Sequence, residues 1–301
     1  MINYSIIIPH KDIPALLLRC VSSIPRRSDT EIIIVDDHSN QNTKMILEQK
    51  LSKSENLRII YNNENRNGGG AARNIGLDKS RGKWIIFADA DDYFNYCIEE
   101  ILDKYQNSNS DVIYFKGNSV DTNTYTTTYR TNHLNQWIEQ YSKNPQKAEL
   151  SLRYLFGEPW CKIIRKSLID KYNIRFDEIP IHNDTTFSYL IGFHAKNIQI
   201  DNRALYCVTT REHSVSVSVN PMKELTRVDV FSKAESFFKK NNIPVVIDWH
   251  YRQCADFLFR KDFKLYKKGL NIIKKNLDSI SYKYIYKEVL KLFIKKIIGK
   301  I

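Results

Sequence analysis

The sequence predicts an α/β fold with a mostly parallel sheet flanked by helices. Over the first 115 residues, short apolar runs rich in isoleucine and aromatic residues alternate with segments whose apolar residues recur at helical spacing. Such alternation implies right-handed crossovers between parallel strands. Two of the runs end in clustered carboxylates. At 301 residues, 42% of them hydrophobic and 27% charged, the chain can bury a large core in one elaborated domain or two.

Each predicted strand of this half is a short, mainly apolar run, as expected for strands buried on both faces of a parallel sheet. Pro9 ends the first strand, and Gly82 ends the helix before the fourth. The strands are expected at 4–9, 31–37, 57–61, 84–88 and 111–115. The helices are expected at about 13–24, after His38-Ser39-Asn40 through Leu51, at about 71–80 and at about 97–106.

The pattern changes after residue 116. Residues 118–135 are rich in Thr, Asn and Tyr and are expected to form an irregular strand or a loop, whereas 136–176 are expected to be mainly helical. From about residue 222 the chain is expected to be helical and increasingly basic. The sequence therefore predicts three parts, with boundaries at 1–116, 117–221 and 222–301.

The spacing of the cysteines and the hydropathy of the chain indicate the cellular compartment of the protein. The five cysteines lie far apart with no CxxC pair, which argues against a disulfide framework or a structural zinc site and favours a reducing compartment. The N-terminus lacks the layout of a signal peptide. No apolar stretch approaches the ~18–20 residues that span a bilayer.

The net charge of +12 is concentrated at the C-terminal end. Residues 261–301 hold twelve Lys, no Arg and three acids, so they carry +9 and the first 260 residues only +3. One helical face of the tail is apolar and lysines occupy much of the rest, which predicts an interfacial helix on an anionic membrane. The alternative is a helix packed on the body with a solvated lysine face. Nucleic acid is an unlikely partner because the tail lacks Arg. The apolar residues are Leu290, Phe293, Ile294, Ile297, Ile298 and Ile301, and the lysines are Lys287, Lys291, Lys295, Lys296 and Lys300.

Carboxylates follow two of the predicted strands. Asp36-Asp37 and the cluster Asp89, Asp91 and Asp92 should reach the same edge of the sheet, where open α/β sheets bind ligands. Three converging carboxylates repel one another unless a cation joins them, and hard oxygen ligands suit Mg²⁺ or Mn²⁺. The alternative is an acidic turn that caps the next helix.

A glycine-rich segment, Asn67 to Asn74, opens the predicted helix at 71–80. Its free backbone N–H groups could face an anion, and Arg73 could pair with a phosphate. No Gly-Lys-Ser/Thr follows it, and no GxGxxG follows the first strand, so a dinucleotide cofactor is not expected. A simple tight turn is the alternative.

Four blocks of the sequence together resemble the family 2 glycosyltransferases, which have the GT-A fold. The blocks are residues 5–9, 31–39, 70–77 and 82–92, and looser resemblance continues through 160–169 and 183–187. The resemblance implies a nucleotide-sugar donor, most often UDP-linked, on 1–116, an acceptor-binding and catalytic half at 117–221, and a basic helical tail. It places Asp91 on Mn²⁺ or Mg²⁺, which would neutralise the leaving diphosphate. It implies donor contacts for Pro9, His10, Asp12, Asp37, Arg73, Asp89 and Ala90.

The resemblance also implies an inverting reaction. Asp184 matches the general base that takes the proton from an acceptor hydroxyl, although a helix N-cap is its alternative role. Asn183 stands where the family usually has Glu, so it is a possible acceptor contact. Trp160 is a possible acceptor platform or a core residue. His213 is a possible metal or phosphate contact or a solvated loop residue.

The family's usual Pro-x-Tyr-Asn after the first strand is here Pro9-His10-Lys11-Asp12, which leaves the nucleobase preference open. The expected function is inverting, metal-dependent sugar transfer in assembly of a lipid-linked surface polysaccharide, by a cytoplasmic protein peripheral on the inner membrane face. The alternatives are a sugar-nucleotide-forming nucleotidyltransferase and a non-catalytic membrane- or nucleic-acid-binding protein. A nucleotidyltransferase should show a Gly-rich phosphate loop after the first strand, where this chain has none.

Overall fold

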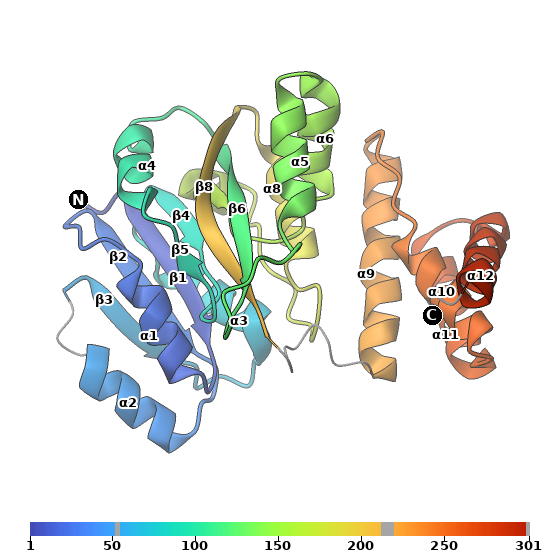
Figure 1. Ribbon diagram of the computed structural model, residues 1–301, viewed down its shortest axis with the longest axis horizontal. Coiled ribbons are helices and arrows are strands. Elements are labelled where there is room, and N and C mark those ends of the chain that lie inside the picture. Colours follow the sequence, from blue (N-terminus) through green and yellow to red (C-terminus); the bar gives the residue numbers. More distant parts are fainter. Residues whose placement is uncertain (52–54, 212–219, 299–301) are drawn as a thin grey trace. The chain divides into compact units, whose positions relative to one another are not determined.

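The computed structural model describes residues 1–51, 55–211 and 220–298. The chain forms two units (Figure 1). The larger, Met1–Glu178 with Asn183–Glu212, contains the sheet, and the smaller, Ile179–His182 with His213–Ile301, is helical.

The first four long strands of the larger unit are the predicted apolar runs. They pair in parallel in the order β3-β2-β1-β4, and nearly every residue of β1 and β2 and all of β4 are buried. The chain adds β2 and β3 on one side of β1 and then returns to place β4 on the other side. Right-handed crossovers therefore put the first two connecting helices on one face of the sheet and the third on the other. The strands are β1 (Tyr4–His10), β2 (Thr30–Asp36), β3 (Leu57–Tyr61) and β4 (Trp84–Phe87), and the helices are α1 (Pro14–Ser22), α2 (Gln41–Leu51) and α3 (Gly68–Lys79).

The other half of the sheet is mixed. The complete order is β3-β2-β1-β4-β7-β6-β8-β5, in which β7 is antiparallel to both neighbours and β8 is parallel to β6 but antiparallel to β5. The strands are β5 (Tyr93–Phe94), β6 (Val112–Asp121), β7 (Lys162–Arg165) and β8 (Ile198–Thr210). The helices are α4 (Ile98–Tyr105), α5 (Asn132–Tyr141), α6 (Pro145–Tyr154), α7 (Lys166–Lys171) and α8 (Thr185–His194).

The structure corrects the sequence prediction in two places here. In the region 118–135, which β6 enters by pairing with β8 as far as Asp121, helix α5 already begins at Asn132. The region 136–176 contains helical residues of α5, α6 and α7, but also β7, which inserts between β4 and β6, and irregular segments at 155–161 and 172–176. The extent of β6 and the insertion of β7 depend on pairing with strands distant in the chain. The α/β class with its mostly parallel first half is confirmed.

Small residues let α3 lie close to its neighbours. A side chain at Gly76 would collide with Ile7 of β1, and one at Gly70 would collide with the backbone carbonyl of Asp177. Gly68 begins the helix with a φ of 91°, a conformation that glycine adopts without strain. The glycine-rich segment is therefore needed for close packing as well as for its free N–H groups.

The smaller unit has its own apolar core. Val228 and Phe257 are fully buried in it, together with Ile273 and Ile285. Its helices are α9 (Pro221–Lys240), α10 (Trp249–Phe259), α11 (Phe263–Asn276) and α12 (Tyr282–Ile297). Asn220 and Asp262 cap α9 and α11 by accepting backbone N–H bonds. Among the described residues, no helix combines the length and apolarity needed to cross a bilayer.

Candidate active site

The carboxyl ends of β1, β2 and β4 meet at one edge of the sheet. His10 is in register with Asp36, and the N–H of Asp37 donates to the His10 carbonyl at 2.8 Å. The N–H of Ala88, just past β4, donates to the carbonyl of Ile7 at 3.1 Å. Both acidic segments therefore lie at the edge where an open α/β sheet binds its ligands.

His10 and Asp36 form a buried pair beneath this edge. His10 Nδ1 lies 3.1 Å from Asp36 Oδ2, and its Nε2 accepts the N–H of Ile13 at 3.2 Å, so Nδ1 carries the proton. Burial works against the Asp36 carboxylate, but hydrogen bonds from His10 and Ser39 outweigh it and hold the pKa of Asp36 below its ordinary value. The pair fixes the turn after β1, where Asp12 accepts the N–H of Asn40 at 2.9 Å.

Asp37 ties β2 to the start of α3. Its Oδ2 accepts the N–H of Gly68 at 2.8 Å, and its Oδ1 accepts from Asn62 at 3.2 Å. The acidic group thus takes the place of a helix cap, which suits the positive end of α3. Pro9 is partly buried and Ala90 is buried at the same edge.

Strand β8 holds the acidic turn after β4. The hydroxyl of Tyr206 accepts the N–H of Asp89 at 2.7 Å. Thr209 donates its N–H to Asp92 at 2.6 Å and its hydroxyl to the Asp91 carbonyl at 2.7 Å. Arg19 of α1 also donates to that carbonyl. Four side chains or backbone groups therefore fix the direction in which the three carboxylates point.

The turn concentrates negative charge. Burial, followed by the charges of Asp89 and Asp91, raises the pKa of Asp92 well above its ordinary value. Burial and Asp89 also raise the pKa of Asp91, whereas Arg211, whose Nε lies 3.0 Å from Asp91 Oδ2, lowers it. A cation at Asp91 would relieve this repulsion.

The carboxylates at this edge suit a hard cation that takes its other ligands from a phosphate or from water. The described residues contain no group of three or more His, Cys, Asp or Glu side chains that could hold a metal. Mg²⁺ is commonly held by one or two carboxylates and completed by phosphate oxygens and water. Asp92 is bound to the backbone of Thr209 and Asp89 to Arg73, so Asp91 is the candidate for such a site, where a cation would compete with its ion pair to Arg211.

Arg73 of α3 joins the acidic turn to the predicted base. Its Nη2 donates to Asp89 Oδ1 at 2.6 Å and its Nη1 to Asn183 Oδ1 at 2.9 Å, while its guanidinium stacks over Phe176. The side chain is only 9% exposed. One buried cation therefore contacts both the edge after β4 and the residue before Asp184.

Asp184 stands at the N-cap position of α8, but its side chain accepts no capping hydrogen bond. Burial raises its pKa to about 6, against the lowering effect of Arg73. A carboxylate with this pKa is ionised near neutral pH and still basic enough to accept a proton. The group is thus free for chemistry rather than used as a cap.

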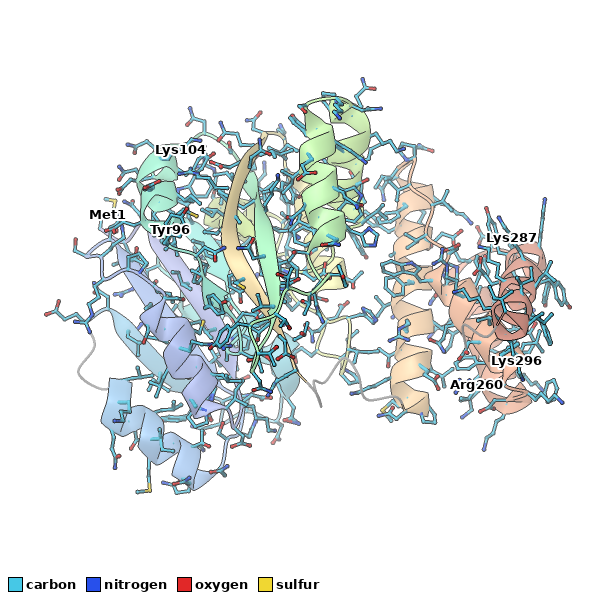
Figure 2. All side chains as sticks on the ribbon, viewed as in Figure 1. Met1, Tyr96, Lys104, Arg260, Lys287 and Lys296 are labelled. Atoms are coloured by element: carbon cyan, nitrogen blue, oxygen red, sulfur yellow. The ribbon has the colours of Figure 1, made fainter. Side chains whose placement is uncertain are left out.

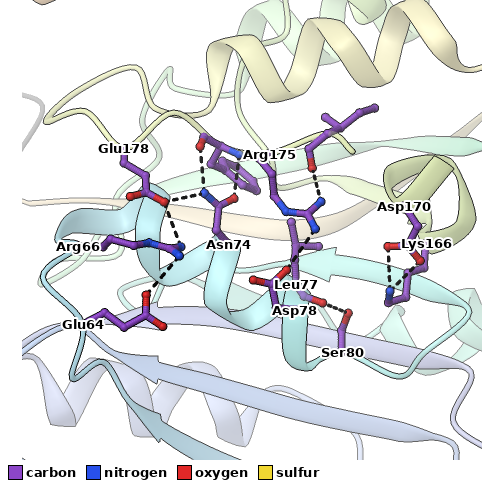
Figure 3. A network of polar contacts seen from close by, with 12 residues as sticks. Glu64, Arg66, Asn74, Leu77, Asp78, Ser80, Lys166, Asp170, Arg175 and Glu178 are labelled. Atoms are coloured by element: carbon purple, nitrogen blue, oxygen red, sulfur yellow. Dashed lines mark hydrogen bonds and ion pairs between the residues drawn. The ribbon is translucent and has the colours of Figure 1, made fainter. Parts of the chain in front are cut away.

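A polar network fastens the segment before Asp184 to α3 (Figure 3). Asn74 donates to the carbonyl of Phe176 at 3.0 Å and accepts its N–H at 2.9 Å. Arg66 pairs with Glu178 at 3.0 Å, and Arg175 pairs with Asp78 at 3.1 Å. The N–H of Asp177 then donates to the Asn183 carbonyl at 2.9 Å. Helix α3 therefore positions both Arg73 and the approach to Asp184.

A buried lysine, Lys162 of β7, supports α8 from behind. Its ammonium donates to the carbonyls of Phe156 and Glu158 at 3.0 and 2.7 Å and to the Ser188 hydroxyl at 3.1 Å. Burial lowers its pKa to about 7, although the charges of Glu158 and Asp184 work in the other direction. All three of its donors are satisfied without a direct ion pair.

Two further residues are predicted as contacts, Trp160 with the acceptor and His213 with a metal or a phosphate. Trp160 is 3% exposed and packs between Phe156 and Tyr206, with ring centroids 5.3 and 6.2 Å away, which corresponds to the core-packing alternative. His213 lies outside the described residues. Local sequence pattern does not predict five residues that contact the site or support it, namely Arg19, Tyr206, Thr209, Arg211 and Lys162. The apolar run 204–208 was the signal for β8, and pairing with β6 and β5 brings its last residues to the acidic turn.

Comparisons with known proteins identify the family of the chain. The sequence profile of glycosyl transferase family 2 matches residues 5–172, more than half of the chain. The poly(ribitol-phosphate) β-N-acetylglucosaminyltransferase TarS of Staphylococcus aureus is 25% identical over 73% of this chain and 38% of its own length. The uncharacterized glycosyltransferase EpsJ of Bacillus subtilis is 26% identical over 73% of this chain and 64% of its own length. The chain thus spans less than two thirds of these relatives.

Solved structures share the fold. TarS residues 1–349 in complex with UDP-GlcNAc superpose with a TM-score of 0.63, covering 91% of this chain and 81% of that chain at 20% identity. The mannosyltransferase PcManGT of Pyrobaculum calidifontis, in complex with GDP-Man and Mn²⁺, has a TM-score of 0.56 at 11% identity, covering 97% and 80%. The sheet and its flanking helices are therefore of the GT-A type.

Proposed function

The chain belongs to glycosyl transferase family 2, and we propose that it transfers a sugar from a UDP-linked donor to an acceptor hydroxyl with inversion at the anomeric carbon. The observation that carries this proposal is the pair of contacts made by Arg73. Its guanidinium holds Asp89 at the nucleotide edge and Asn183 beside a free, basic Asp184. The proposed donor site and the proposed base therefore both lie next to the side chain of Arg73.

In the proposed reaction Asp184 accepts the proton of the acceptor hydroxyl. The hydroxyl oxygen attacks the anomeric carbon as the bond from that carbon to the diphosphate oxygen breaks, and the nucleoside diphosphate leaves with its electron pair. An α-linked donor then yields a β-linked product. A pKa of about 6 keeps Asp184 mostly ionised at neutral pH. Mn²⁺ or Mg²⁺ at Asp91 would supply charge neutralisation for the diphosphate.

Donor recognition is assigned to the edge formed by β1, β2 and β4. Asp37 and the turn after Pro9 flank the nucleobase, and Asp89, Ala90 and Arg73 face the ribose and sugar. A UDP donor is supported by the relative whose structure contains UDP-GlcNAc. Asn183 is assigned to the acceptor side because Arg73 orients it next to Asp184.

The proposed acceptor is a growing surface glycan on a lipid carrier at the cytoplasmic face of the membrane. A polymeric acceptor is supported by the relative that acts on poly(ribitol phosphate). A lipid carrier also agrees with the lysine-rich C-terminal end of the chain. The protein would then act as a peripheral membrane enzyme.

The test is a donor screen that measures nucleoside diphosphate release with lipid-linked glycan acceptors, with Mn²⁺, Mg²⁺ or EDTA. UDP-sugars should give acceptor-dependent release that stops with EDTA and falls at least about a hundredfold in Asp184→Asn. Asp170→Asn, which changes an exposed carboxylate on α7, is the matched control and should retain activity. Wild-type activity in the Asp184 variant, or pyrophosphate as the released product, would contradict the proposal.

A further inference from the structure

Helix α12 presents two apolar faces. One face packs into the core of the smaller unit through Ile285, which is fully buried, and Val289, which packs against the same cluster. The other face stays exposed, with Leu290 at 61% and Ile297 at 82%. A surface helix of a soluble protein normally needs only the face that it buries, so the second face requires an explanation.

Five of the exposed apolar residues form one continuous stripe, while Tyr284 and Ile294 are exposed elsewhere on the helix. Successive members are separated by three or four positions, so they lie on one side of the helix over its whole length. Phe293 packs edge-on against Phe259 of α10, with ring centroids 5.0 Å apart, and still remains 51% exposed. Packing against α10 therefore holds the stripe in place while its residues remain exposed to water. Its residues are Tyr282, Tyr286, Leu290, Phe293 and Ile297.

A row of exposed lysines begins beside the stripe, because Lys283, Lys287, Lys291 and Lys295 recur every four residues. At about 3.6 residues per turn this row moves around the helix, so that Lys283 and Lys287 flank the stripe and Lys295 lies on the opposite side. Among the described residues, Lys291 of this row forms an ion pair with Glu288. Lys287 and Lys296 are labelled on α12 in Figure 2. Cations therefore flank the apolar stripe over the first half of the helix.

We propose that this face of α12 docks into an anionic lipid bilayer, with the apolar stripe among the acyl chains and the flanking Lys283 and Lys287 at the headgroups. An exposed apolar stripe beside Lys is the arrangement of an interfacial helix, and the tyrosines at its start are residues that favour the membrane–water boundary. Juxtaposed lysines are attracted to anionic headgroups. A nucleic acid would use the lysines but leave the apolar stripe in water.

The surface is independent of the proposed chemistry, because none of its residues belongs to the candidate active site. It does specify how a transferase could reach an acceptor on a lipid carrier. The proposal therefore stands or fails on lipid binding alone, and catalysis is a separate measurement.

The test is sedimentation of the full chain with vesicles of phosphatidylcholine, alone or mixed with phosphatidylglycerol. The wild type should bind the mixed vesicles at least about tenfold more tightly, and added salt should weaken this binding. Leu290→Ser and Ile297→Ser should each weaken it about tenfold. Val246→Ser is the matched control, because Val246 is 76% exposed in the smaller unit but lies outside α12, and its binding should be unchanged.

Two readouts separate this docking from its alternatives. Circular dichroism and release of nucleoside diphosphate with a soluble acceptor should be unchanged in the serine variants, since the substituted side chains are exposed. Equal binding to neutral vesicles, or unchanged binding by the serine variants, would overturn the proposal. So would a dimer in sedimentation velocity that Leu290→Ser dissociates, because a second copy of the chain would then cover this face.

Discussion

Asp184→Asn is predicted to stabilise the fold at neutral pH. Burial raises the pKa of Asp184 from 3.8 to about 6, a shift of about two units, and each unit corresponds to about 1.4 kcal/mol. The ionised carboxylate therefore costs the folded state about 2–3 kcal/mol, the lower figure allowing for the partial exposure of the residue. Asparagine has nearly the same shape and carries no charge, so it avoids this cost.

The sign of the pH dependence follows from the direction of the shift. Between pH 3.8 and about 6 the folded state binds more protons at Asp184 than the unfolded state does, so the free energy of unfolding falls as pH rises. The contribution is fully present below pH 3.8 and is lost above pH 6. The variant should match the wild type near pH 4 and exceed it by about 2–3 kcal/mol above pH 7.

Urea denaturation from pH 4 to 8 measures this difference. A Trp249→Phe background removes the tryptophan of the smaller unit, so that fluorescence reports only on the unit that contains Asp184. Asp170→Asn, an exposed carboxylate, should change stability by no more than about 0.5 kcal/mol at any pH. A variant less stable than the wild type at pH 7.5, or a difference that does not grow with pH, would refute the assigned cause of the shift.

Four further substitutions test the packing and charge around the site. Gly70→Ala should destabilise by about 1–3 kcal/mol in thermal unfolding because its side chain meets backbone, whereas Gly69→Ala, whose added methyl group meets Arg73 Nη1 at 3.1 Å, should cost less because only a small shift of a side chain is needed. Burial lowers the pKa of Lys162 from 10.5 to about 7, so wild-type stability should rise between pH 7 and 10, and Lys162→Met should lack that rise. Arg211→Gln should strengthen Mn²⁺ binding to the donor-free protein about fivefold in calorimetry, because the guanidinium no longer competes for Asp91. Unchanged or weaker Mn²⁺ binding would contradict that competition.

Local pattern was enough to predict the parallel half of the sheet. Each strand from β1 to β4 is a run of buried apolar residues, and this pattern alone locates it within one or two positions. The meeting of Asp36 and Asp89 at one edge follows from parallel pairing, so it too was accessible from the sequence.

The rest of the sheet and the partners of the acidic turn depend on pairing between distant segments, which local sequence pattern does not reveal. Strand β7 is only four residues long and contains Lys162, whose buried ammonium is tolerated because backbone carbonyls satisfy it. The partners of the acidic turn, Tyr206 and Thr209, lie more than 110 residues further along the chain. No local rule links them, because the pairing of β8 with β5 and β6 decides which turn they reach.

Arg73 connects the stability of the fold to the proposed chemistry. Without its charge the buried carboxylate of Asp184 would have a still higher pKa, so more of it would be protonated and inactive at neutral pH. A stronger cationic partner would make Asp184 easier to ionise but a weaker base. Because the same guanidinium also binds Asp89, a substitution of Asp89 that removes this ion pair is expected to alter the position of Arg73 and hence the pKa of Asp184.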